Sequence, residues 1–123
     1  MMNRTPARAR AVIRGAGAWA GVNGLATFRQ CRRGVLVTVE VHGLPVGEGD
    51  CPEDFFGLHI HQGETCTGTP ERPFAHAGGH FQRWECPHPA HTGDLPPLLG
   101  CRGHAFSSFL TDRFRVEQII GRT

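Results

Sequence analysis

The chain has 123 residues, of which 39% are hydrophobic and 20% charged, and its formal net charge at pH 7 is +2. These values are typical of one small globular domain and exclude both a long disordered tail and a pair of domains. No stretch approaches the ~18 uncharged apolar residues that a membrane helix needs, and the arginine-rich start leads into no apolar signal segment. We therefore expect a cytoplasmic protein without a membrane partner.

The positive charge is concentrated at the start of the chain. Residues 1–33 hold seven arginines and no acid, whereas residues 34–123 hold six arginines and eleven acids. A basic segment can contact nucleic acid or attract a small anion, but a solvated strand face is the commoner explanation. We expect no nucleic-acid partner, and we divide the chain into a flexible N-terminus over residues 1–8 and one domain over residues 9–123.

Short strands are predicted along most of the chain. The 17 glycines and nine prolines favour turns over a helical bundle. Apolar and polar residues alternate most clearly over residues 35–42, and more weakly over residues 9–14 and 25–31, which together predict an antiparallel meander. Alternation resumes over residues 55–61. The last regular stretches, at residues 95–99 and 104–111, flank a glycine-containing turn and predict a hairpin.

Two histidines in the strand at 55–61 are candidate metal ligands. His59 and His61 are two residues apart, so their imidazoles project from the same face of the strand. Phe56, Leu58 and Ile60 project from the opposite face and can build the core. An isolated His-x-His is equally well explained as two surface residues.

The segment after this strand strengthens the metal interpretation. Residues 62–94 show neither helical nor strand periodicity, and loops of this length are usually functional or disordered. The segment contains His80, His88, His91 and Asp94. Imidazole suits copper and zinc alike, and a carboxylate with two or three histidines is an accepted zinc shell, so two neighbouring metals are plausible.

Other residues could also bind a metal. Cys86 is an alternative zinc ligand, because the run Cys-x-His-x-x-His is compatible with zinc but too short to be diagnostic. His42, His76 and His104 each stand alone in the sequence. We interpret them as surface or hydrogen-bonded histidines.

Five blocks of the sequence resemble the copper-zinc superoxide dismutases in that family's order. They are Gly43-Leu44-Pro45, Gly57-Leu58-His59-Ile60-His61, Ala77-Gly78-Gly79-His80-Phe81, His91-Thr92-Gly93-Asp94-Leu95 and Ile119-Ile120-Gly121-Arg122-Thr123. The resemblance implies an all-β Greek-key β-sandwich or barrel with about six of the family's eight strands and a long metal-binding loop. It implies dismutation of the superoxide anion to oxygen and hydrogen peroxide, with copper and zinc as cofactors, and it leaves a homodimer open.

The same resemblance assigns roles to individual residues. It implies that His59, His61 and His80 bind copper, and that His80, His88, His91 and Asp94 bind zinc. His80 would then bridge the two metals and relay a proton in catalysis. Only two residues separate His88 from His91, a shorter spacing than the family usually has.

The resemblance also bears on the cysteines and on the end of the chain. Cys66 matches the position of a cysteine that anchors this loop by a disulfide in bacterial members, but the family's partner cysteine has no counterpart here, so we expect free thiols. The family continues past the block ending at Thr123 into a strand with a fourth copper histidine. We therefore expect a C-terminally incomplete domain, and three interpretations stay open: a superoxide dismutase, a metal-binding module without turnover, or an inactive fragment of a longer reading frame.

Overall fold

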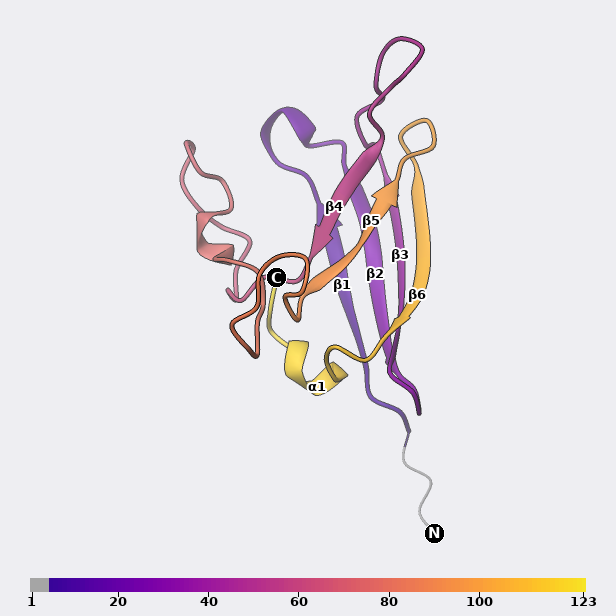
Figure 1. Cartoon of the computed structure of the whole chain (residues 1–123). Helices are drawn as coiled ribbons and strands as arrows, with labels where there is room; N and C mark the ends of the chain where they lie inside the picture. The colour runs from indigo at the N-terminus through magenta and orange to yellow at the C-terminus, as the bar shows by residue number, and fades with distance from the viewer. Residues whose placement is uncertain (1–4) are drawn as a thin grey trace.

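The fold consists of two antiparallel β-sheets with very little helix (Figure 1). The computed structural model describes residues 5–123; residues 1–4, part of the segment expected to be flexible, lie outside the described residues. One sheet has the order β1 (Arg8–Arg14), β2 (Asn23–Gln30), β3 (Val35–His42), β6 (Ala105–Thr111), and the other pairs β4 (Phe55–His59) with β5 (Asp94–Leu99). The predicted all-β sandwich is confirmed, with six strands among the described residues.

The core lies between the two sheets. The predicted meander is confirmed, because β1, β2 and β3 are consecutive antiparallel neighbours. On β3 the four valines at alternate positions are at most 3% exposed, as the period of two requires. The opposite sheet contributes Leu98 and, immediately after β4, Ile60.

The predicted hairpin between residues 95–99 and 104–111 is wrong. β5 pairs with β4, and β6 pairs with β3, so the two strands leave their common turn into different sheets (Figure 1). The turn itself is tight, with Arg102 and Gly103 both at positive φ. Pro96 and Pro97 lack the amide hydrogens that a regular ladder needs, and they lie where the register between β4 and β5 shifts. The turn between β5 and β6 therefore forms a corner of the sandwich, where the chain passes from one sheet to the other.

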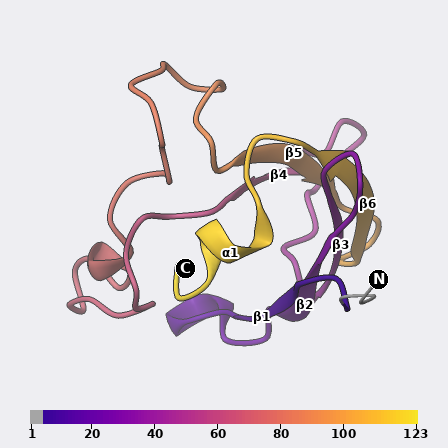
Figure 2. The same cartoon turned by 90° about the horizontal axis from the view of Figure 1, so that it is seen from below.

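The helical elements are short and lie outside the strands. α1 (Val116–Ile119) lies across one end of the space between the sheets (Figure 2). Phe114, Val116 and Ile119 are at most 7% exposed and close the core at this end. The other helical elements of the described residues are two 3₁₀ turns, η1 (Gly17–Trp19) and η2 (Ala75–Ala77). Within residues 5–123, no helix is long enough to cross a membrane.

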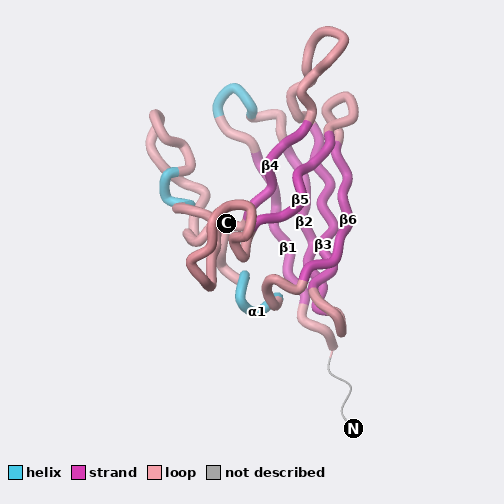
Figure 3. The backbone as a smooth tube through the Cα atoms, in the orientation of Figure 1, coloured by secondary structure: helices cyan, strands magenta, loops and turns pink. Residues whose placement is uncertain are grey.

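The long connection between β4 and β5 emerges at the end of the sandwich where α1 lies (Figure 3). It contains η2 but no strand, as its lack of periodicity predicts. This loop, the end of β4 and the start of β5 together carry the six candidate metal ligands.

Candidate metal centre

Three chain segments are tied together by backbone hydrogen bonds at the centre of the candidate site. The amide of Phe81 donates to the carbonyl of Ile60 at 2.7 Å, that of Ile60 to Gly93 at 2.9 Å, and that of Gly93 to Phe81 at 2.8 Å. Ile60 and Phe81 are also buried in the core. Gly93 is required by this close approach, because a Cβ there would lie 2.4 Å from the Ile60 carbonyl oxygen. The ring of bonds fixes the backbone directly beside four candidate ligands, namely His59, His61, His80 and Asp94.

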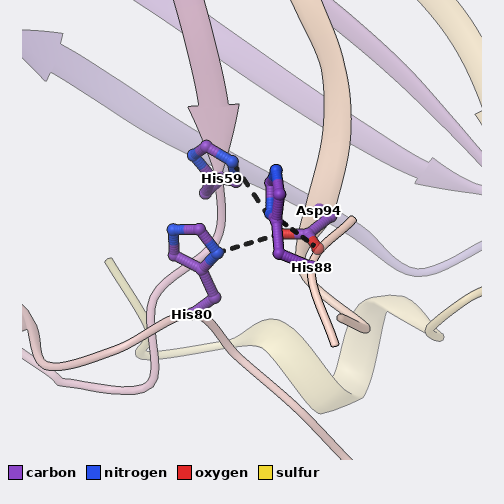
Figure 4. Close-up of side chains that lie close together, drawn as sticks. All are labelled: His59, His80, His88 and Asp94. Carbon is purple, nitrogen blue, oxygen red and sulfur yellow. Dashed lines mark ion pairs between the residues drawn. The ribbon is translucent and has the colours of Figure 1, made fainter. Parts of the chain in front are cut away.

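The carboxylate of Asp94 lies at the middle of the histidines, and its side chain is only 3% exposed. Figure 4 shows three of these imidazoles around it. Four ring nitrogens approach its two oxygens: His80 Nδ1 at 2.9 Å and His59 Nε2 at 3.8 Å from Oδ1, and His88 Nδ1 at 3.2 Å and His91 Nδ1 at 3.3 Å from Oδ2. The backbone amide of His91 also donates to Oδ2 at 2.9 Å, which orients the carboxylate.

The imidazoles are packed against one another as well as against the carboxylate. His80 Nδ1 lies 3.1 Å from His91 Nδ1. The ring of His59 stacks on that of His80, with centroids 3.8 Å apart, and His61 meets His80 edge-on at 5.1 Å. His61 Nδ1 donates to the carbonyl of Gly78 at 2.8 Å, so the lone pair of this ring is on Nε2. A ring hydrogen bond of this kind is what orients metal-binding histidines.

The electrostatics favour an ionised Asp94 carboxylate and a neutral His59 imidazole. Burial opposes ionisation of Asp94, but the amide of His91 and the positive charge that His91, His88 and His80 can carry outweigh it, so the pKa of Asp94 is lowered. Burial, together with the neighbouring His80, lowers the pKa of His59. Both groups are thereby held in the forms that bind a metal ion.

The arrangement fits a transition-metal ion. Asp94 Oδ1 is buried and has no hydrogen-bond partner among the described residues, although His80 Nδ1 is 2.9 Å away, because that approach lacks hydrogen-bond geometry. A cation bound between the two atoms would satisfy both. The potential ligand atoms of His59, His80, His88 and Asp94 all lie within 4.8 Å of one another, and imidazole nitrogen with carboxylate oxygen is a donor set for zinc and copper.

All six predicted ligands lie in this one cluster. The convergent group takes His59, an expected copper ligand, together with three expected zinc ligands, and leaves His91 and His61 at its edge. Asp94 carries the carboxylate of the cluster, and the ring nitrogens of four histidines lie within 4 Å of it. Cys86 is in no convergent group within residues 5–123, and the five cysteines of these residues, Cys66 included, form no disulfide in the structure.

Arg113 supports the site and was not predicted from the sequence. It follows β6, and its Nη1 donates to three carbonyls of the ligand-bearing segment, those of Pro89 at 2.8 Å, His91 at 3.1 Å and Asp94 at 3.2 Å. Arg113 also lines a cleft of about 510 Å³ beside His59, His88 and Asp94. A single arginine after a strand carries no sequence signal for this role, which depends on β6 ending beside the loop.

His42 and His104 lie on the surface, as expected, and His42 Nε2 is 3.0 Å from Glu40 Oε1. Together with Glu40 the two histidines form a second convergent group there. The two histidines are 62 positions apart, and the pairing of β3 with β6 brings them together. His76 is in neither group and is hydrogen-bonded to Thr67 Oγ1 at 2.8 Å, as expected of a surface or hydrogen-bonded histidine.

The fold and the site define a β-sandwich protein with a candidate metal centre, in which four imidazoles approach a buried carboxylate. Comparison with known sequences makes this specific: the family model for copper/zinc superoxide dismutase (SODC) matches residues 22–123, and the chain belongs to that family. It is also 34% identical over 120 residues to "Superoxide dismutase [Cu-Zn]" of Deinococcus radiodurans, a match that covers 83% of this chain and 62% of that protein. The chain thus spans less than two thirds of the length of this relative.

Proposed function

We propose that this protein binds copper and zinc at the described cluster and dismutates superoxide to oxygen and hydrogen peroxide. The observation that carries the proposal is the buried Asp94 carboxylate, which has four imidazole nitrogens within 4 Å and an oxygen without a hydrogen-bond partner. Family membership supports the reaction. The name of the Deinococcus radiodurans relative supports both metals.

The zinc ligands in this proposal are His80, His88, His91 and Asp94. Each of these histidines directs Nδ1 toward the carboxylate, at 2.9–3.3 Å. Three nitrogens and one oxygen provide the four ligands of a closed tetrahedral zinc shell. The ring of backbone bonds and Arg113 hold the segment that carries the carboxylate.

The copper ligands in this proposal are His59, His61 and His80. The hydrogen bond from His61 Nδ1 to Gly78 leaves its Nε2 free to bind a metal. Because His80 directs Nδ1 to the zinc ligands, its Nε2 is left for the second metal, and the rings of His59 and His61 adjoin it. One imidazole can therefore serve both ions.

Bound copper would supply the redox chemistry, by accepting an electron from one superoxide and giving an electron to the next. Reduction of superoxide to hydrogen peroxide also consumes two protons, and His80 Nε2 is the protein atom placed to deliver one of them. The His80 ring stacks on His59 and turns Nδ1 toward the proposed zinc ligands, so Nε2 is the ring atom left to carry the proton. The remaining proton comes from water.

A second candidate function is metal binding without turnover. It is favoured by the position of His59, which stacks on His80 and has Nε2 3.8 Å from Asp94, within the group that would bind zinc. In that case the cluster holds a single ion at the carboxylate. The two candidates share the zinc ligands and differ only in what His59 and His61 do.

Superoxide decay separates the two candidates. The metal-free chain is loaded with copper and zinc, and the decay of a superoxide pulse is followed together with bound metal. We expect decay to accelerate in proportion to bound copper, to be lost in His61→Gln, and to be unchanged in His76→Gln, a histidine outside both groups. Zinc binding without accelerated decay would instead establish the second candidate.

A further inference from the structure

A second group of metal-ligand side chains lies on the outer face of the four-stranded sheet. Glu40 and His42 are two residues apart on β3, so both project outward, opposite to the buried Val39 and Val41. His104 immediately precedes Ala105, which pairs with Val41, and therefore lies across from His42. Strand pairing thus places one carboxylate and two imidazoles on the same small area of surface.

The distances within this group match those of a metal shell. His42 Nε2 lies 3.0 Å and His104 Nε2 3.9 Å from Glu40 Oε1, and all three ligand atoms are within 4.8 Å of one another. With metal–ligand bonds of about 2.0–2.2 Å, two ligands of a tetrahedral ion are about 3.3–3.6 Å apart. Small rotations of half-exposed side chains reach that spacing without moving the backbone.

The backbone under the group is held from two sides. The two-residue turn before His104 is closed by hydrogen bonds in both directions between Cys101 and His104, at 2.6 and 3.0 Å. The amide of Leu44 also donates to the carbonyl of Gly103 at 3.0 Å, which joins this turn to the end of β3. The ligand-bearing positions are therefore fixed relative to each other before any ion binds, which lowers the entropic cost of binding.

An ordinary surface ion pair does not account for all three residues. Glu40 and His42 alone would form such a pair, and exposed pairs contribute little to stability. His104 adds a second imidazole, stacked on the first with centroids 4.7 Å apart and planes 20° apart, and directs Nε2 to the same carboxylate oxygen. Three donors that converge on one point form a chelate.

We propose that Glu40, His42 and His104 bind one divalent transition-metal ion, Zn²⁺ or Cu²⁺, through Oε1 and the two Nε2 atoms. Two imidazoles and a carboxylate are a recognised zinc ligand set that leaves a fourth position to water, and the same donors bind Cu²⁺. The site is separate from the Asp94 cluster. Strand β6 begins beside this group and ends at Thr111, two residues before Arg113, which contacts the Asp94 cluster, so the two sites lie at opposite ends of the strand.

Bound metal would link β3 to the corner between the sheets. A ligand that binds the folded state stabilises it in proportion to the logarithm of its concentration over its dissociation constant. The second site thus gives the fold a dependence on metal that does not involve the Asp94 cluster, and this inference does not rest on the proposed enzymatic function.

Calorimetric titration of the metal-free full chain with Zn²⁺ tests the proposal. We expect the unchanged chain to bind one more equivalent than the double variant His42→Gln/His104→Gln, and the control His76→Gln to bind as many as the unchanged chain. A third variant, Glu40→Gln, keeps both imidazoles and should weaken this equivalent at least about tenfold. If circular dichroism shows that the double variant does not fold, the affinity of Glu40→Gln for Zn²⁺ decides the test.

A chain with Asp94→Asn separates this proposal from the proposed function. The second site should still bind its equivalent in that chain, and Cu²⁺ should broaden the amide resonances of residues 40–42 and 104–106. The proposal is overturned if the unchanged chain and the double variant bind equal numbers of equivalents, or if Glu40→Gln binds Zn²⁺ within twofold of the unchanged chain.

Discussion

Replacing Arg113 by glutamine tests whether the described contacts hold the metal centre together. The guanidinium Nη1 has two hydrogens and faces three carbonyls at 2.8–3.2 Å, so it makes two good hydrogen bonds at a time. Hydrogen bonds from a charged donor contribute about 1.5–3 kcal/mol when buried, and these are partly exposed, so we expect about 1.5–3 kcal/mol for both together. Because these hydrogen bonds order the ligand-bearing segment, their loss should reduce the free energy of metal binding by the same amount.

At about 1.4 kcal/mol per factor of ten, Arg113→Gln should weaken zinc binding by about 10- to 100-fold. Competition with a coloured chelator measures the affinity. Arg72→Gln is the matched control, because Arg72 is an exposed arginine in the same loop whose side chain has no hydrogen bond or ion pair within residues 5–123. Binding by Arg113→Gln within twofold of the unchanged chain, or equal weakening by Arg72→Gln, would refute the reasoning.

Three further predictions follow from the same geometry. Gly93→Ala places a Cβ 2.4 Å from the Ile60 carbonyl and should lower the free energy of unfolding by about 1–3 kcal/mol, visible in urea titration. Because the pKa of His59 is lowered in the folded chain, the unfolded chain binds a proton at this residue first as the pH falls below about 6.5, and the folded chain loses stability. The metal-free chain should therefore unfold at less urea at pH 5 than at pH 7.5, and equal midpoints would contradict this. The lowered pKa of Asp94 adds to the loss of stability below pH 3.8. Chelation should make residues 62–93 sensitive to trypsin, and identical digestion with and without chelator would show that metal does not order the loop.

The sequence predicted the strands because most of them turn one face toward the core. Alternation of valines over residues 35–42 defines β3, and the same period marks β1, β2 and β4. Periodicity is a local signal, however, and it says nothing about which strands pair. The hairpin prediction failed for that reason: the turn at Arg102 and Gly103 is tight, but the strands on its two sides enter different sheets.

The candidate site was likewise predicted where the signal is local and missed where it depends on strand pairing. His59, His61, His80, His88, His91 and Asp94 were found from short blocks, because each block keeps its ligands within a few residues. Arg113 was missed because its contacts depend on where β6 ends. The pairing of His42 with His104 was missed because it depends on the register between β3 and β6.

The metal content of the Asp94 cluster tests the central claim most directly. The chain carrying His42→Gln/His104→Gln, which removes the second group, is purified without an affinity tag, equilibrated with copper and zinc, and dialysed. We expect at least one copper or zinc ion per chain, and its loss when His80→Ala is added, because His80 lies in both proposed ligand sets. A folded chain that retains no metal, or one that retains the same metal without His80, would contradict the account.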